Sequence, residues 1–474
     1  MRYLSAPVLL VFALSSCGPQ AGYSGKNGAS AVMAHNAPEN FPADSLLEGV
    51  KITSDTSLSF ALYLPSSYSS GKKYPLLVFF DPHGAGAFPL GKYRSLASRY
   101  GFILAGSNNS KNGLPWDVTG SIADKLMNDL KSRISVDEKR IYLAGFSGGA
   151  RVAGLAAMTR EDVAGMIGCS AGLPADKKIT RKFLYIGIAG DGDFNLNEMN
   201  MVKYSLDRMG FANALMVAEG GHRWPGEKDM EEAFLWLRIN EMKTGTTEKD
   251  EGLISTAEKF IKDRAQANVK SKRMLYAAAA YARMADCLGG IADTLPYART
   301  LSEIRSGKEY RQEFELQKKL AKEEFELQQS YLGALKIKPG AWWEMEVARV
   351  NSLMKASGYE ERMMYKRILG YLSLVLYMNC TAALNEGDWP RAFDLINLYS
   401  LVDPPNPEHA YLMAVVYAVQ KNPERALQYM EEAAHLGFND TGRMDNDPML
   451  SSLRMLPAYP HLREKVKGAV TPEQ

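Results

Sequence analysis

Hydrophobic and polar positions follow one pattern up to residue 243 and a different one beyond it. In the first region, apolar runs of strand length alternate with stretches of helical spacing, which predicts a mostly parallel sheet with helices on both faces. Residues 49–53 and 59–64 alternate in polarity and predict a hairpin at the sheet edge, turning through residues 54–57. Further strands are predicted at 76–80, 102–107, 141–145, 163–169, 183–189 and 213–217, and helices at 121–133, 199–209, 227–243 and from near residue 148.

The second region, expected over residues 250–474, has helical spacing and no strand-like run. Residues 244–247 are the expected boundary between the two domains. Near the end, residues 388–393 align with residues 422–427, which sets Ala392 and Ala426 34 residues apart. That period resembles the tetratricopeptide repeat. The earlier helices of this region fit either degenerate repeats or a plain bundle.

The N-terminal segment has the pattern of a targeting sequence. Met1 and Arg2 precede an apolar run, residues 4–14, that is too short to span a bilayer as a stable helix. Leu14-Ser15-Ser16-Cys17 then resembles the lipobox of a bacterial lipoprotein, which implies a signal peptide over residues 1–17 and acylation of Cys17. An ordinary secretory signal with an incidental cysteine is the alternative, and both predict export. Residues 18–44, rich in Gly, Ser, Ala and Pro, are predicted to be a flexible tether.

Composition agrees with a multidomain globular protein and gives no sign of a nucleic-acid partner. The chain has 474 residues, 46% of them hydrophobic, and a formal net charge of +2. Cys169, Cys287 and Cys380 are odd in number and far apart, so we expect buried thiols instead of disulfides or metal ligands. The sequence therefore gives no reason to expect a metal or another cofactor.

Candidate chemistry starts at the end of the predicted strand 141–145. The chain continues as Gly145-Phe146-Ser147-Gly148-Gly149, which predicts a tight turn into a helix with Ser147 at its apex. Small residues two positions before and after the serine let strand and helix pass closely, and Gly145 and Gly149 meet that need. Taken alone, the pattern also fits a purely structural glycine-rich turn.

Polar residues at two later strand ends strengthen the catalytic interpretation. Residues 190–195, Gly-Asp-Gly-Asp-Phe-Asn, follow one strand, and residues 219–225, Glu-Gly-Gly-His-Arg-Trp-Pro, follow the next. Serine, acid and then histidine is the chain order of the α/β-hydrolase fold. Residues 45–243 thus resemble an α/β-hydrolase of the esterase type. The Gly-Gly-His-x-Trp-Pro segment is similar to that of feruloyl-esterase and polyhydroxyalkanoate-depolymerase relatives.

This resemblance implies a role for each site residue. Ser147 would be the nucleophile, His222 the general base and then acid, and Asp193 the carboxylate that orients His222. The loop His83-Gly84-Ala85 would supply the Ala85 amide, which together with the Gly148 amide would form the oxyanion hole. Asp191 is the alternative acid and His83 the alternative base, and His222 could instead be a surface-loop residue.

The resulting expectation is an exported, lipid-anchored serine hydrolase of the bacterial cell envelope, most simply a carboxylesterase. Its partners would be a small or polymeric ester and the membrane through the anchor. The helical repeats would either bind a protein or serve only as a packing partner for the hydrolase, covering its site entrance or serving a dimer. The residues Phe146, Gly148 and Asp81-Pro82 depart from the usual depolymerase pattern, which weakens the case for a polymer. Two alternatives remain: a serine peptidase with the same triad, and a binding or assembly lipoprotein without turnover.

Overall fold

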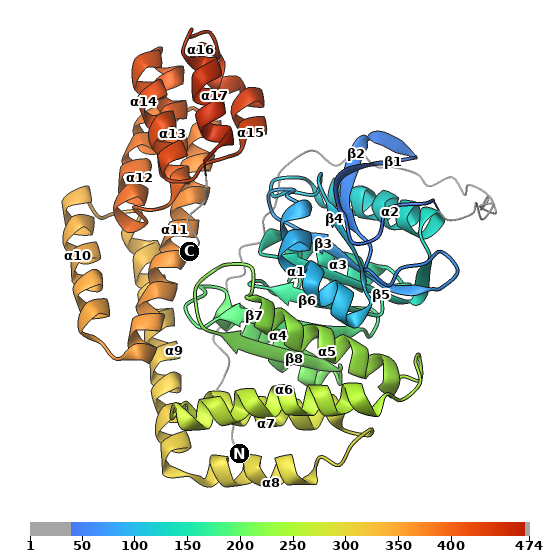
Figure 1. Cartoon of the computed structure of the whole chain (residues 1–474). Coiled ribbons are helices and arrows are strands. Elements are labelled where there is room, and N and C mark those ends of the chain that lie inside the picture. Colours follow the sequence, from blue (N-terminus) through green and yellow to red (C-terminus); the bar gives the residue numbers. More distant parts are fainter. Residues whose placement is uncertain (1–38, 470–474) are drawn as a thin grey trace. The chain divides into compact units, whose positions relative to one another are not determined.

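The computed structural model describes residues 39–469, so Cys17, the signal segment and most of the predicted tether lie outside the described residues. The described chain divides into two compact units. The first unit contains residues up to 190, 195–219 and 223–313, and the second contains 191–194, 220–222 and 314 onward. Figure 1 labels the elements of both units in sequence colours.

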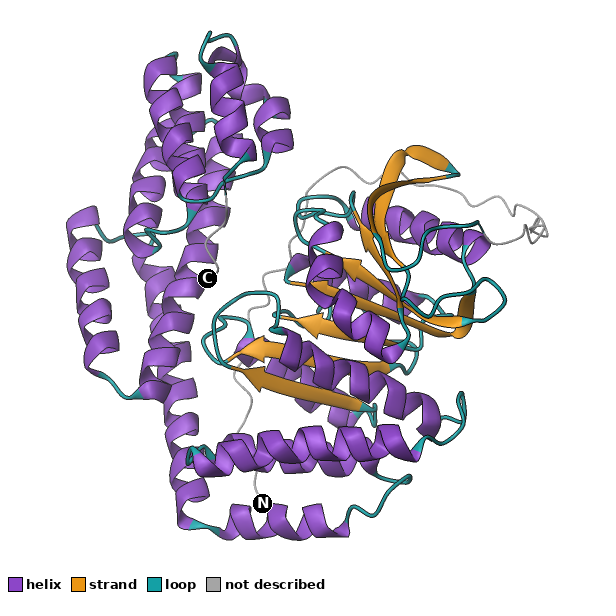
Figure 2. Cartoon of the chain, viewed as in Figure 1, coloured by secondary structure: helices purple, strands orange, loops and turns teal. Residues whose placement is uncertain are grey.

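The first unit is built on a mixed sheet, which within residues 39–469 has eight strands in the order β1-β2-β4-β3-β5-β6-β7-β8 (Figure 2). Pairs β1–β2 and β2–β4 are antiparallel and every later pair is parallel. The structure therefore confirms a mostly parallel sheet with a hairpin at one edge. The strands are β1 Leu46–Ile52, β2 Asp55–Tyr63, β3 Tyr74–Phe80, β4 Ile103–Ser107, β5 Val136–Phe146, β6 Gly165–Cys169, β7 Leu184–Gly190 and β8 Asn213–Ala218.

Helices cover both faces of this sheet, as the continuous apolar strands require. Leu77 and Phe79 of β3 belong to the same core as α1 and α5. Their neighbours Leu76, Val78 and Phe80 belong to the core shared with α2 and α3. The sequence pattern did not predict α1, whose first turns contain Pro89 and Gly91. The helices are α1 Ala87–Tyr100, α2 Trp116–Arg133, α3 Gly148–Thr159, α4 Leu196–Arg208 and α5 Glu227–Lys243.

The first unit continues past the expected boundary at residues 244–247 and ends at Glu313. It includes α6 Glu251–Lys270, α7 Met274–Leu288 and α8 Leu295–Ser306, whose buried faces join the core of α1 and α5. Glu232 of α5 is fully buried, and its carboxylate pairs with Arg283 of α7 at 3.0 Å and Arg264 of α6 at 3.2 Å. Shared apolar faces and a shared buried carboxylate therefore make these helices part of the hydrolase unit.

The second unit is largely helical. Asp388 and Asn422 cap α12 and α14 in the same way, each accepting a hydrogen bond from the amide three residues later. Ala392 and Ala426 are both fully buried, so the two aligned segments occupy equivalent positions in their helices. The helices are α9 Lys308–Ala334, which begins in the first unit, α10 Gly340–Ala356, α11 Tyr359–Glu386, α12 Trp389–Val402, α13 Pro407–Val419, α14 Pro423–His435, α15 Thr441–Asn446, the 3-10 turn η1 Pro448–Leu450, α16 Ser451–Arg454 and α17 Tyr459–Lys467.

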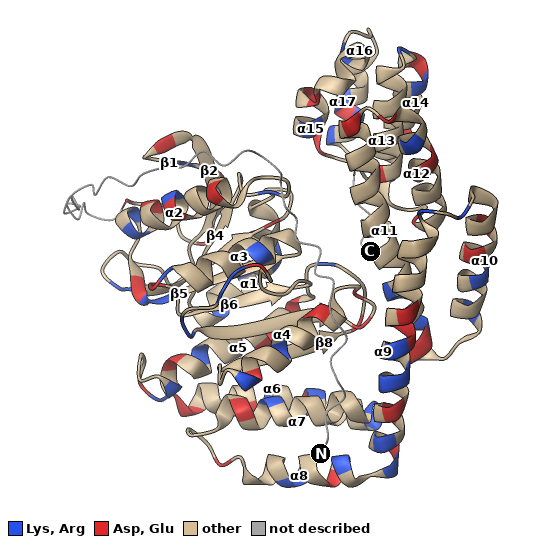
Figure 3. Cartoon of the chain, turned by 180° about the vertical axis from the view of Figure 1, so that it is seen from behind, with Lys and Arg blue, Asp and Glu red and all other residues tan. Residues whose placement is uncertain are grey.

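Two of these helices differ sharply in surface character. Lys and Arg alternate with Asp and Glu along α9 (Figure 3). Within the part of the chain that the structure describes, α11 alone is long and apolar enough to cross a membrane by length and composition. Its Ile368, Leu372 and Leu376 are almost fully buried in the core of the second unit, as in a core helix.

Candidate active site

Ser147 occupies a strained turn between β5 and α3. Its φ of 52° and ψ of −121° are rare for a residue with a side chain, and it is partly exposed. A Cβ on Gly145 would collide with the main chain of Gly149, and one on Gly149 would collide with the carbonyl of Phe80. Because those neighbours are backbone atoms, only glycine fits at either position. The turn therefore holds the Ser147 hydroxyl at the carboxyl edge of the sheet.

A buried carboxylate, Asp81, organises the loop that carries Ala85. Asp81 Oδ1 accepts the His83 amide at 2.8 Å and the Ala85 amide at a long 3.4 Å, and Oδ2 accepts Trp224 Nε1 at 2.9 Å. Burial alone would raise the pKa of Asp81, but its hydrogen bonds with His83 and Trp224 hold the pKa below the usual range. The side chain of His83 is 75% exposed. The sequence marked Asp81 only as unusual, with no role.

Asn112 is a second residue of this region that the sequence did not identify. The main-chain N–H of Asn112 donates to the carbonyl of Pro82 at 2.8 Å. Its side-chain oxygen occupies the space that a Cβ on Gly148 would need. A lone asparagine in a polar loop carries no sequence signal, because it becomes informative only when the fold brings it beside Gly148. The side-chain amide of Asn112 is thus a polar group next to Gly148, the candidate oxyanion donor.

The loops after β7 and β8 bring an acid and an imidazole together. His222 Nδ1 lies 3.1 Å from Asp193 Oδ1, and Asp193 is fully buried whereas the His222 side chain is 21% exposed. Phe194 stacks on the His222 ring with the ring centroids 4.2 Å apart. A carboxylate that binds Nδ1 fixes the tautomer in which Nε2 can accept a proton.

Asp191 has different partners from Asp193. Its carboxylate accepts hydrogen bonds from the Gly220 amide at 3.0 Å and from the Tyr359 hydroxyl at 2.6 Å. The Gly192 amide donates to the Gly220 carbonyl at 2.8 Å, so residues 191–192 tie the acid loop to the histidine loop. The other candidate acid, Asp193, lies 3.1 Å from His222 Nδ1 through its Oδ1.

The predicted site residues fall in both units. Ser147, Gly148 and Ala85 belong to the first unit, and Asp193 and His222 belong to the second. Strands β5, β7 and β8 are parallel members of one sheet, so the loops that leave their carboxyl ends start from the same edge.

The three cysteines of the described chain are free and buried, as predicted. Burial raises the pKa of Cys380 to about 12 and the pKa values of Cys169 and Cys287 further. Across residues 39–469, no three His, Cys, Asp or Glu side chains gather as metal ligands would.

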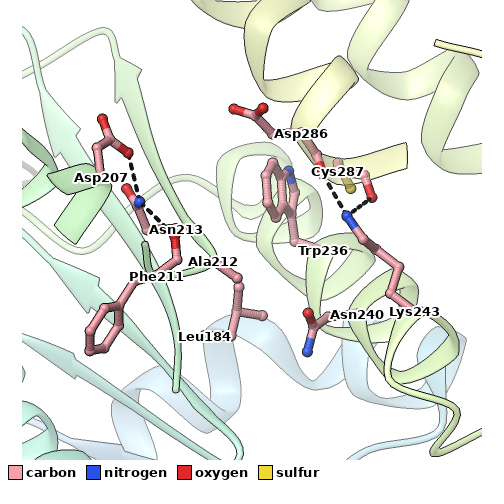
Figure 4. A pocket seen from close by; sticks show the side chains of 10 residues that line it. All are labelled: Leu184, Asp207, Phe211, Ala212, Asn213, Trp236, Asn240, Lys243, Asp286 and Cys287. Atoms are coloured by element: carbon pink, nitrogen blue, oxygen red, sulfur yellow. Dashed lines mark hydrogen bonds between the residues drawn. The ribbon is translucent and has the colours of Figure 1, made fainter. Parts of the chain in front are cut away.

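A pocket of about 320 Å³ in the first unit has a different location (Figure 4). Leu184 and Asn213, which line it, begin β7 and β8, so the pocket lies at the opposite end of these strands from the acid and histidine loops. Lys243 Nζ donates to the main-chain oxygens of Asp286 at 2.6 Å and Cys287 at 3.2 Å there. The pocket is therefore separate from the candidate active site.

The sheet, its covering helices and the strand–serine–helix turn together define the α/β-hydrolase fold, followed in this chain by an all-α region. No protein-family model and no curated protein matches the sequence.

Solved structures do match part of the chain. An S-formylglutathione hydrolase from Staphylococcus aureus is 16% identical with a TM-score of 0.32, and the match covers 38% of this chain and 92% of that one. Esterase PE8 is 19% identical with a TM-score of 0.33, covering 40% of this chain and 99% of its own. A ferulic acid esterase is 18% identical with a TM-score of 0.31, and the match covers 38% of this chain and 91% of that one.

Proposed function

We propose that this protein is a serine hydrolase, most simply a carboxylesterase, in which Ser147 is the nucleophile, His222 the general base and Asp193 the orienting acid. The observation that carries the proposal is the left-handed backbone of Ser147 between β5 and α3. Such a conformation is costly for a residue with a side chain and persists only where the surrounding structure holds it, as at many active sites. The contact between His222 and Asp193 supports the same assignment.

The proposed reaction proceeds through an acyl-enzyme. Ser147 Oγ attacks the ester carbonyl carbon while His222 Nε2 takes the hydroxyl proton. The amides of Gly148 and Ala85 stabilise the resulting oxyanion, a contribution of about 3 kcal/mol per donor in comparable sites. Collapse of the intermediate expels the alcohol, which receives the proton from His222. Water then attacks the acyl group with the same proton transfers, and the acid and free Ser147 are released.

We also propose export and lipid anchoring through Cys17, with the helical region as a surface for a protein partner. The short apolar run before Leu14-Ser15-Ser16-Cys17 supports the anchor, and the equivalent caps of α12 and α14 support a repeat.

Labelling of the complete chain with a fluorescent fluorophosphonate tests the nucleophile. We expect wild type to be labelled and Ser147→Ala not to be, because only a serine activated by a base beside an oxyanion hole reacts quickly with this probe. Ser170→Ala is the matched control, since Ser170 also has a positive φ, 57°, directly after the neighbouring strand β6.

Retained labelling in Ser170→Ala would support Ser147 as the nucleophile. Turnover of short-chain esters by wild type would support a carboxylesterase. A folded wild type without label would overturn the hydrolase proposal. Faster cleavage of peptides than of esters would replace the esterase by a peptidase.

A further inference from the structure

The two short loops that carry Asp193 and His222 belong to the second unit, together with α10, α11 and most of α9. They lie along one face of α11. Tyr359, Met363, Arg367 and Gly370 are spaced three or four residues apart, as residues on a single helix face are. Each of the four lies close to residues 191–194, as the contacts below show.

Tyr359 binds the side chain of Asp191, and Arg367 binds its main chain. The Tyr359 hydroxyl donates to Asp191 Oδ2 at 2.6 Å, and Arg367 Nη1 donates to the Asp191 carbonyl at 2.6 Å. Arg367 is itself fixed by Glu324 of α9, whose carboxylate accepts Nη2 at 2.7 Å and Nε at 3.0 Å. Both members of this ion pair are buried, Glu324 fully. A forked, buried ion pair restricts the guanidinium, so Arg367 can hold the loop in a fixed position.

Gly370 makes the close approach of α11 to Phe194 possible. A Cβ at Gly370 would lie 3.0 Å from Cδ1 of Phe194, so the glycine leaves room for that ring. Phe194 in turn stacks on His222. On the same face, Met363 Sδ would be 3.4 Å from a Cβ at Gly192. A continuous set of contacts therefore leads from α11 through Phe194 to the imidazole.

We propose that α11 is a positioning element of the active site. Tyr359 and Arg367 are positioning residues that keep Asp193 and His222 aligned with each other. The inference rests on the proposed hydrolase function and adds to it that the helical region is part of the catalytic machinery. Asp191 is then the link between α11 and the two catalytic loops, because its carboxylate also accepts the Gly220 amide. Turnover is expected to depend on contacts of α11 that never touch substrate.

Two pairs of variants in the complete chain test this. Tyr359→Phe removes only the hydroxyl that binds Asp191, and its matched control is Tyr331→Phe, which removes a hydroxyl that donates to Glu346 at 2.6 Å. Gly370→Ala pushes against Phe194, and its matched control is Gly333→Ala in α9, where an added Cβ meets nothing within 4 Å. Alanine favours a helix over glycine at both positions, and thermal unfolding of each variant separates a loss of stability from a loss of activity.

The measurements are kcat and KM on a short-chain p-nitrophenyl ester, and hydrogen–deuterium exchange of peptides that contain residues 191–194 and 220–222. We expect Tyr359→Phe and Gly370→Ala to lower kcat by about tenfold, because looser loops would hold Asp193 and His222 in the reactive geometry less often, with KM within about twofold. Exchange in both loops should become faster in Tyr359→Phe, and both controls should behave like wild type.

The two proposals fail in different ways. A wild type without turnover overturns the proposed function, whereas loop exchange is measured without any reaction. If kcat and loop exchange in Tyr359→Phe and Gly370→Ala match those of the controls, α11 does not position the site and the inference is wrong.

Discussion

At the scale of single residues, Asp81 shows how one buried carboxylate can organise the loop that carries a candidate oxyanion donor. It accepts the amide of His83 and the indole N–H of Trp224, whose ring packs against Phe79 and Phe146. The loop that presents Ala85 is thereby tied to the segment that follows His222 in the sequence. Asp81 is only 4% exposed, so the stability of this arrangement should depend on its charge.

Replacing Asp81 with Asn should destabilise the fold by about 1–3 kcal/mol at neutral pH, the usual cost of impairing buried hydrogen bonds to a charged group. The lowered pKa of Asp81 means that its stabilising contribution is complete above the unfolded-state pKa, near 3.9, and is lost as the pH falls through the lower folded-state value. Urea unfolding at pH 7 and below about pH 3.5 measures the difference, which should shrink in acid.

The control for this prediction is Asp117→Asn, at an exposed position in the first turn of α2. Its unfolding free energy should stay within about 0.5 kcal/mol of wild type. An Asp81→Asn difference that does not change with pH would contradict the proposed role of its charge.

At the scale of elements, the crossing of β5, α3 and β3 depends on residues without side chains. A Cβ on Gly145 would collide with the main chain of Gly149, and a Cβ on Gly149 would collide with the main chain of Phe80. Strand pairing on both sides of β5 prevents the strand from shifting to make room. The same crossing sets the backbone of Ser147, so fold and site share one structural requirement.

Gly145→Ala should therefore cost about 3 kcal/mol of unfolding free energy and abolish Ser147 labelling, because the added methyl group overpacks a backbone crossing. Thermal unfolding and fluorophosphonate labelling check the two effects. Gly120→Ala in α2, where an added Cβ meets nothing within 4 Å, should be neutral or stabilising by up to about 1 kcal/mol. Equal behaviour of the two variants would show that the crossing is not tight.

At the scale of the whole molecule, the candidate catalytic loops group with a part of the chain that is distant in sequence. Residues 191–194 and 220–222 group with the helices that follow the hydrolase region, although they lie within that region in sequence. Helices α6–α8 do the reverse, since they follow the expected boundary yet complete the core of the sheet unit. The functional parts therefore do not follow the order of the sequence.

Anchoring is tested on the complete protein in cells. Cys17→Ala should reduce the amount of mature, membrane-bound protein, because acylation needs the cysteine thiol. Globomycin, which inhibits the lipoprotein signal peptidase, should reduce it as well, because the signal peptide is then not cleaved. Membrane fractionation with detection of the C-terminus measures the shift. Unchanged fractionation in Cys17→Ala would favour simple secretion.

The sequence by itself determined the elements and the chemistry that local patterns encode. Continuous apolar runs specified the strands of the sheet, because a strand buried on both faces must be apolar at every position. The spacing of Gly145, Ser147 and Gly149 specified the tight turn, because only small residues fit its crossing. The succession of serine, acid and histidine at three strand ends indicated the fold and its candidate site.

Only the tertiary structure decided which groups meet. It showed that Asp193 contacts His222 while Asp191 binds Tyr359, 168 residues away in the sequence. It brought Asn112 beside Gly148 and placed α6–α8 in the first core. Such contacts depend on the packing of distant segments, and no local period or spacing records which distant partner a side chain will have.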